Sequence, residues 1–167
     1  MGFTIYYTST RPLSPDQARA VRRAAVRACA GRTWLSCEPV HFFLESPGDD
    51  GRLVGGSKPN FLPHPDDAAS AASEGLPDGD VGALFDVLGR LSRDHGIDWE
   101  IRHDHEPGPV GYIRDGVRDP ELDGLPEALA DMARLIAEFE RGEGPGAEEE
   151  DDDEDEGPTI LRFRPNP

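Results

Sequence analysis

The stretch IDWEIRH, residues 97–103, alternates apolar and polar side chains and therefore predicts a β-strand. Its apolar residues fall on one face, because successive side chains of a strand point to opposite sides of a sheet. Residues 81–95, just before it, carry apolar side chains at helical spacing and stop at Gly96, which is typical of an amphipathic helix and its C-terminal cap. A helix that leads into a half-buried strand is a unit of a mixed α and β domain.

The same two periodicities predict further elements on both sides of this unit. On the N-terminal side these are a strand over 3–8, a helix from Ser14 to Gly31, and strands over 39–45 and 52–57. On the C-terminal side they are a strand within 108–116 and a helix with Pro126 in its first turn and Gly142 as its stop. The stretch 58–80 predicts a long ordered loop with one helical turn after Pro65.

The predicted order of the elements is strand, helix, strand, strand, helix, strand. That is the order of a ferredoxin-like β-α-β-β-α-β sandwich, to which an extra hairpin and a C-terminal helix are added. The fold class is therefore α+β, with one sheet covered by helices. A chain of 167 residues suits one such domain, which we place at residues 1–142 as a single globular unit.

The chain beyond this unit changes character twice. Residues 143–158 hold a run of acidic side chains flanked by glycine and proline, and we expect a disordered acidic linker, because this composition cannot bury a core. Residues 159–167 are apolar and basic again, with Ile160, Leu161 and Phe163 beside two arginines. This short segment is a candidate for binding a partner by adding a strand to an exposed sheet edge. It could equally complete the sheet of its own domain, or be a frayed terminus.

The formal net charge of the chain is −17, and nine consecutive acids at 148–156 carry a large share of it. Without them the net charge is still −8, because 25 acidic side chains remain against 17 basic ones. Like charges repel across a surface, so nucleic acid and membranes are disfavoured as partners, and a basic protein is favoured. Solubility alone is the simpler explanation of the same charge.

The chain lacks the marks of an exported or membrane protein. The stretch MGFTIYYTST has no basic region followed by an apolar core, and no apolar run approaches the roughly 20 residues of a transmembrane helix. Cys29 and Cys37 are expected to be reduced, buried thiols, and Cys37 lies about 13 Å from His41 along a strand, too far for a nucleophile and its base. Sixteen arginines against a single lysine are typical of a GC-rich bacterial genome, so we expect a bacterial cytoplasmic protein.

His103 and His105 form the clearest candidate for a metal site. If the strand through 97–103 continues, both point to the same face and could bind one ion of zinc, iron or manganese. Such a site needs a third or fourth ligand, for which the candidates are His64 and Asp66, with Asp67 and His41 as further choices. The alternative is that both histidines are ordinary polar residues at a strand end.

The stretch GGSKPN, residues 55–60, contains the only lysine of the chain and suggests a tight turn that presents Lys58 and Asn60 as binding residues. It is not a phosphate-binding P-loop, because Ser57 precedes the lysine instead of following it. A chance surface lysine is the alternative.

The general profile, small, acidic and without a catalytic signature, resembles that of bacterial toxin-neutralising immunity proteins in composition and size. That resemblance implies a protein-binding role and assigns no site. We therefore expect a non-enzymatic protein-binding module, immunity- or adaptor-like, that engages a basic partner. The alternative function is a metal-dependent enzyme with a site built on His103, His105 and the loop 57–67.

Overall fold

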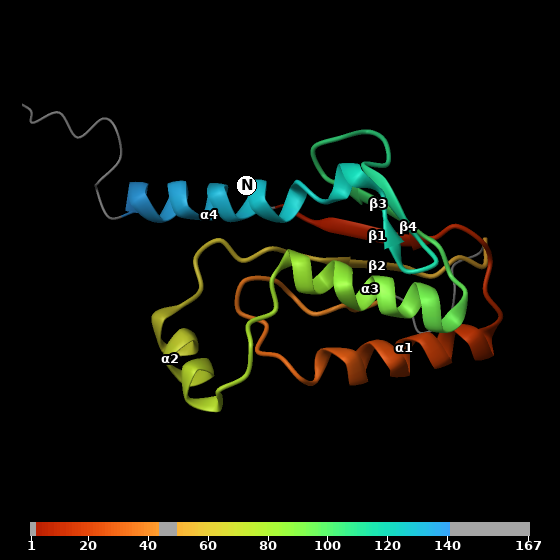
Figure 1. Cartoon of the computed structure of the whole chain (residues 1–167), viewed down its shortest axis with the longest axis horizontal. Coiled ribbons are helices and arrows are strands. Elements are labelled where there is room, and N and C mark those ends of the chain that lie inside the picture. Colours follow the sequence, from red (N-terminus) through yellow and green to blue (C-terminus); the bar gives the residue numbers. More distant parts are fainter. Residues whose placement is uncertain (1–2, 44–49, 141–167) are drawn as a thin grey trace, which may run out of the picture.

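The computed structural model describes residues 3–43 and 50–140 of the chain, which form one five-stranded sheet and four α-helices (Figure 1). This arrangement confirms the predicted α+β class. The elements are β1 (Ile5–Ser9), α1 (Pro15–Cys29), β2 (Val54–Ser57), α2 (Pro65–Glu74), α3 (Val81–His95), β3 (Trp99–His103), β4 (Gly111–Arg114), β5 (Val117–Arg118), the 3-10 helix η1 (Pro120–Leu122) and α4 (Leu125–Glu140).

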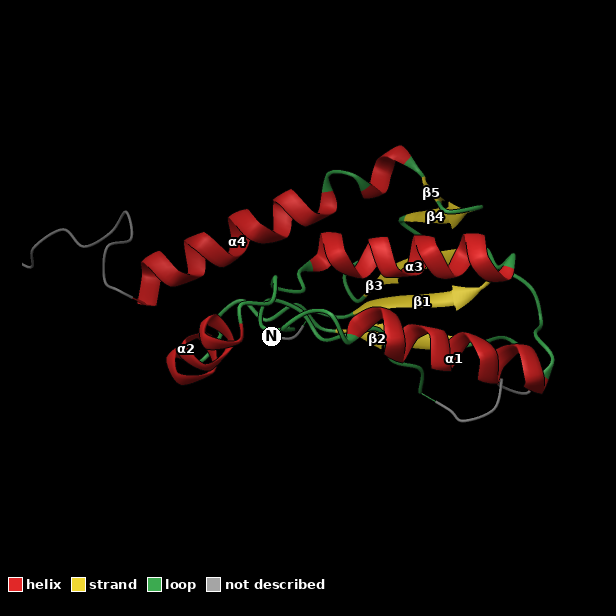
Figure 2. Ribbon diagram, turned by 60° about the horizontal axis from the view of Figure 1, so that its bottom comes forward, coloured by secondary structure: helices red, strands yellow, loops and turns green. Residues whose placement is uncertain are grey.

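The sheet is antiparallel throughout, in the order β2-β1-β3-β4-β5. The helices α1 and α3 contact each other and cover the same face of it (Figure 2). Every second residue of β1 points to the opposite face, where Tyr6 and Thr8 lie beside Arg102 and Glu100 of β3 and remain partly exposed. One packed face and one solvated face are usual in an antiparallel sheet.

The hydrophobic core lies between the sheet and these two helices. Tyr7 of β1 and Trp99 and Ile101 of β3 are fully buried, and Tyr7 pairs with Ile101 across the two strands. The indole Nε1–H of Trp99 donates a hydrogen bond to the carbonyl oxygen of Leu88 at 3.1 Å, which ties α3 to the sheet. The indole ring of Trp99 is therefore buried while its N–H is hydrogen-bonded.

The ends of α1 and α3 follow from their sequences. The Ser14 hydroxyl accepts from the N–H of Gln17, and the Gln17 side chain accepts from the N–H of Ser14, so that α1 begins with a capping box. The helix α3 ends at Gly96, which adopts the left-handed conformation with φ 60°.

The strand predicted over 39–45 is wrong for the described residues 39–43, which make only one isolated bridge, between Phe42 and Gly55. The Tyr7 hydroxyl accepts from the N–H of His41 at 2.9 Å and donates to its carbonyl oxygen at 2.8 Å, so that this N–H is not available to a neighbouring strand. Among the described residues 39–43, backbone pairing with β2 consists of the bonds from the N–H of Gly56 to His41 and from the N–H of Phe43 to Val54. The ferredoxin-like topology, which needs this strand, stays a prediction.

Two further segments differ from the prediction. The single turn expected after Pro65 is a ten-residue helix, α2, which ends at the left-handed Gly75. The strand expected within 108–116 is the first arm of a short hairpin, β4 and β5, whose turn residues Asp115 and Gly116 have φ of 49° and 78°. An Asp-Gly pair with two positive φ values is typical of a tight hairpin turn.

Candidate functional site

The two histidines of the predicted metal site lie at the end of β3 against the ring of Phe3, with ring centroids 5.0 Å and 5.5 Å from it. The N–H of His105 donates to Nδ1 of His103 at 3.1 Å. This bond engages Nδ1 of His103 with the backbone two residues on, a local contact typical of a turn. This geometry favours the alternative prediction, a polar strand end.

The other proposed ligands serve local structure. Nδ1 of His64 accepts from the N–H of Asp66 at 3.3 Å, which makes His64 the N-cap of α2. Asp66 and Asp67 are exposed in the first turn of that helix, where carboxylates interact favourably with its dipole. Over residues 3–43 and 50–140, no group of three or more His, Cys, Asp and Glu side chains is placed to hold a metal ion.

Lys58 lies at a hollow of about 370 Å³ on the solvated face of the sheet, which Glu38 and His41 also line. Glu38 is held there by two hydrogen bonds. Its Oε2 accepts from the N–H of Lys58 at 3.1 Å, and its N–H donates to the carbonyl oxygen of Lys58 at 2.9 Å. Gly56 makes room for the exposed ring of Phe43, because a Cβ there would lie 2.6 Å from that ring. The single lysine therefore stands beside a carboxylate at the sheet edge.

Asn60 does not share this hollow with Lys58. Its Oδ1 accepts from the N–H of Leu62 at 3.3 Å, and its N–H donates to the carbonyl oxygen of Ser36 at 2.9 Å. Asn60 instead lines a second hollow, next to α4. The two residues that the sequence suggested as one binding turn thus belong to two different places.

Both cysteines are buried free thiols. Burial, with the charge of Glu38 as a smaller cause, raises the pKa of Cys37 to about 12. Burial also raises the pKa of Cys29. A thiol that stays protonated at neutral pH is a poor nucleophile, so neither cysteine supports catalysis.

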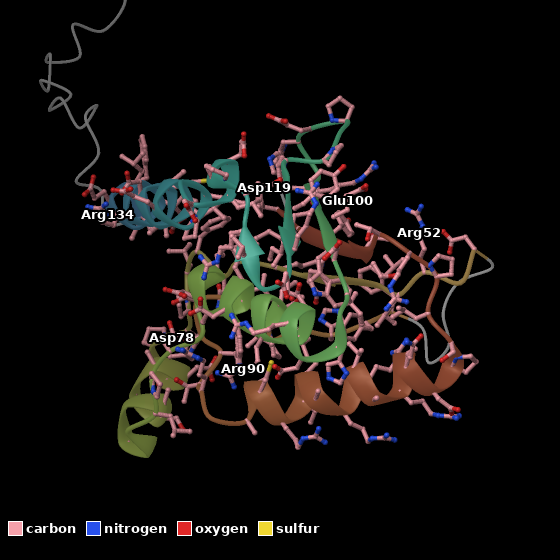
Figure 3. The ribbon with its side chains drawn as sticks, turned by 45° about the vertical axis from the view of Figure 1, so that its right-hand side comes forward. Arg52, Asp78, Arg90, Glu100, Asp119 and Arg134 are labelled. Atoms are coloured by element: carbon pink, nitrogen blue, oxygen red, sulfur yellow. The ribbon has the colours of Figure 1, made fainter. Side chains whose placement is uncertain are left out.

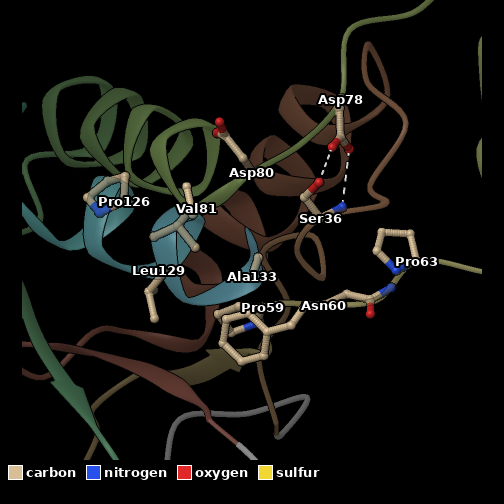
Figure 4. A pocket seen from close by; sticks show the side chains of 12 residues that line it. Ser36, Pro59, Asn60, Pro63, Asp78, Asp80, Val81, Pro126, Leu129 and Ala133 are labelled. Atoms are coloured by element: carbon tan, nitrogen blue, oxygen red, sulfur yellow. Dashed lines mark hydrogen bonds between the residues drawn. The ribbon is translucent and has the colours of Figure 1, made fainter. Parts of the chain in front are cut away.

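The hollow that Asn60 lines, of about 290 Å³, lies between the first half of α4, the start of α3 and the loop after β2 (Figure 4). Val81, Leu129 and Ala133 form its apolar wall. Asp78 forms the polar wall and accepts hydrogen bonds from the N–H and the hydroxyl of Ser36. Burial acts to raise the pKa of Asp78, but these bonds outweigh it, so the pKa is lowered and the carboxylate stays charged.

The second half of α4 exposes large apolar side chains. Met132 is 44% exposed, Leu135 54% and Phe139 67%, whereas Leu129 is only 5% exposed. In Figure 1, α4 runs out past α3, in line with these values. We call Met132, Leu135, Ile136 and Phe139 the α4 apolar face; Ile136 is partly buried.

The α4 apolar face is bordered by acidic side chains. Asp131 pairs with Arg134, but Glu138 and Glu140 occupy the last turn, which contains no basic residue. Carboxylates at this end of a helix interact unfavourably with its dipole. A cation near this end, whether Arg141, which follows Glu140 in the sequence, or one from a partner, would relieve that repulsion.

No family model matches this chain, and no curated protein or solved structure is significantly similar to it. The predicted binding residues Ile160, Leu161 and Phe163 lie outside the described residues. Of the described part, no helix is long and apolar enough to cross a membrane.

The exposure of the α4 apolar face is the feature that the sequence did not reveal. One signal of it is present: Leu125, Leu129, Met132, Ile136 and Phe139 are spaced alternately by four and three residues. This spacing is typical of a seam between two helices. It does not say whether the second helix belongs to the same molecule.

Proposed function

We propose that this chain is a small, non-enzymatic protein-binding module that engages a basic protein partner through the α4 apolar face. The observation that carries the proposal is the exposure of Met132, Leu135 and Phe139 on one stripe of a helix whose first half is anchored by the buried Leu129. Covering the exposed part of these three side chains would contribute about 2–5 kcal/mol, at 1.5–3 kcal/mol for each fully buried side chain. That is a substantial part of the free energy of a specific complex.

The chemistry of α4 indicates what kind of partner fits. An apolar stripe with alternate four- and three-residue spacing is complementary to a second amphipathic helix. Glu138 and Glu140 at the end of the stripe favour a partner with basic flanks, and the net charge of −17 favours its approach. We infer an immunity- or adaptor-like role in the cytoplasm, with residues 143–158 and 159–167 extending the contact.

The fold supports this role for α4. Residues 39–43 make one isolated bridge to β2. If this segment is counted as an irregular edge strand, the order β2-β1-β3 with α1 and α3 is that of a ferredoxin-like core. The hairpin β4–β5 and α4 are then additions to a core that is already closed by two helices. An added helix with an uncovered apolar face is what an interaction surface requires.

Photo-crosslinking in cells that naturally express the protein tests the proposal. The full chain carries a photoreactive phenylalanine analogue at position 135, and a matched control carries it at Val26, which is exposed on α1, away from α4. We expect one main crosslinked protein from position 135 that is absent from position 26. The purified partner should then bind the full chain less tightly as salt increases. The same set of adducts from both positions would contradict the proposal.

A further inference from the structure

Three arginines gather at a hollow of about 180 Å³ between α3 and the hairpin β4–β5. Arg90 and Arg93 come from α3, and Arg118 comes from β5. The other lining residues are Phe85, Asp86, Gly89 and Gly116. The net charge of the whole chain is −17, whereas the side chains at this hollow are mainly basic.

The carboxylates near this hollow leave a net positive charge. Asp86 is the one acidic lining residue, and it pairs with Arg118, whose guanidinium also lies 5.6 Å from the Phe85 ring centroid. In the described part of the chain, neither Arg90 nor Arg93 forms an ion pair. Arg90, labelled in Figure 3, also lines a groove between α1 and α3, whose lining includes Arg27 and Asp94. Three arginines and one aspartate leave a charge of +2 at the hollow.

The backbone around the hollow is held closely together. A Cβ at Gly89 would lie 3.3 Å from the carbonyl oxygen of Gly116, so the hairpin turn packs directly on α3. Gly116 has φ 78°, its N–H donates to the Ser92 hydroxyl at 3.0 Å, and a Cβ there would lie 2.8 Å from Nη2 of Arg93. A site between two rigid elements is organised before its ligand arrives.

We infer that this hollow is an oxyanion site that binds a phosphoryl group. A phosphate monoester carries about −1.5 to −2 at neutral pH, which matches the charge of the hollow. Guanidinium groups donate pairs of parallel hydrogen bonds to phosphate oxygens. The hollow, of about 180 Å³, has room for a phosphoryl group with its substituent reaching outward. The inference is independent of the α4 apolar face.

Calorimetric titration of the full chain with inorganic phosphate and with O-phosphoserine, at constant ionic strength, tests the assignment. The variant is Arg90→Ala with Arg93→Ala, and the matched control is Arg19→Ala with Arg23→Ala, which removes the same charge from exposed positions on α1. We expect saturable binding at one site, weakened at least about tenfold in the first variant and unchanged in the control. Circular dichroism checks that both variants are folded.

The probe that binds with the higher affinity shows whether the site takes free phosphate or a phosphorylated side chain. Either preference supports the assignment. No saturable binding, or an equal loss in both variants, would overturn it. Binding that emerges only when residues 148–156 are replaced by serine would also overturn it, because the chain's own carboxylates would then be the occupant.

Discussion

Alanine substitutions in the first and second halves of α4 should change stability by very different amounts. Leu129 is 5% exposed, and Phe139 is 67% exposed. Replacing a buried leucine by alanine costs about 2–5 kcal/mol. Leu129 lines a hollow of about 290 Å³, so the surroundings of its side chain are already incompletely packed. We therefore expect a loss of unfolding free energy at the lower end of this range, about 2–3 kcal/mol.

For Phe139→Ala the same reasoning gives a small change. Only about a third of the side chain is covered, and alanine has a helix propensity up to about 0.5 kcal/mol better than phenylalanine. The free energy of unfolding should therefore change by no more than about 0.5 kcal/mol, the usual range for surface positions. Urea denaturation of both variants, followed by circular dichroism and tryptophan fluorescence, measures the two values.

One result would refute the reasoning behind the α4 apolar face. If Phe139→Ala costs as much as Leu129→Ala, the ring of Phe139 is covered in the free protein. Sedimentation equilibrium would then show whether a second copy covers it, since the stability of a dimer rises with protein concentration. A monomer with the small Phe139→Ala value leaves the face open for a partner.

Three further predictions concern Tyr7, Cys37 and the two histidines at the end of β3. Tyr7→Phe removes the hydroxyl that serves the N–H and the carbonyl of His41, and should cost about 1–3 kcal/mol in urea denaturation; a loss below about 0.5 kcal/mol contradicts this role. The pKa of Cys37 is raised from 9.0 to about 12, so above pH 9 the unfolded chain loses a proton that the folded chain keeps. Stability should fall with rising pH by up to about 1.4 kcal/mol per pH unit, and Cys37→Ser should reduce that slope. Elemental mass spectrometry should find well under one equivalent of zinc, iron or manganese, unchanged by His103→Ala with His105→Ala; near-stoichiometric metal lost in that variant would restore the enzyme alternative.

The sequence correctly predicted the elements whose side-chain pattern fits only one kind of secondary structure. The alternation in 97–103 and the helix start at Ser14 depend on neighbours in the chain, and β3 and α1 form where expected. The stretch 39–43 has a strand-like composition, but the N–H of His41 is bound by the hydroxyl of Tyr7, 34 residues away, in place of a strand partner. No local pattern contains that contact, because the fold brings the two together.

The candidate sites were harder to predict for the same reason. Lys58 and Asn60 are two residues apart, yet the first lines a hollow with His41 and the second lines one beside α4. The strand β2 ends at Ser57, so the alternation that would place residues 58 and 60 on one face does not continue, and closeness in sequence is poor evidence of a shared site. The arginine hollow shows the converse: Arg90 and Arg118 are far apart in sequence, and a tight turn brings them together.

The uncovered half of α4 is best understood from what the core needs. The sheet has one packed face, and α1 and α3 already cover it, with Trp99 and Tyr7 fully buried between them. Folding therefore gains little from Met132, Leu135 and Phe139, and selection for stability alone would not favour large apolar side chains that stay 44–67% exposed. Nor would it favour two carboxylates in the last turn, where they oppose the helix dipole. The basic amphipathic partner that we propose would remove both of these unfavourable features at once, because it would cover the stripe and bring cations to the helix end.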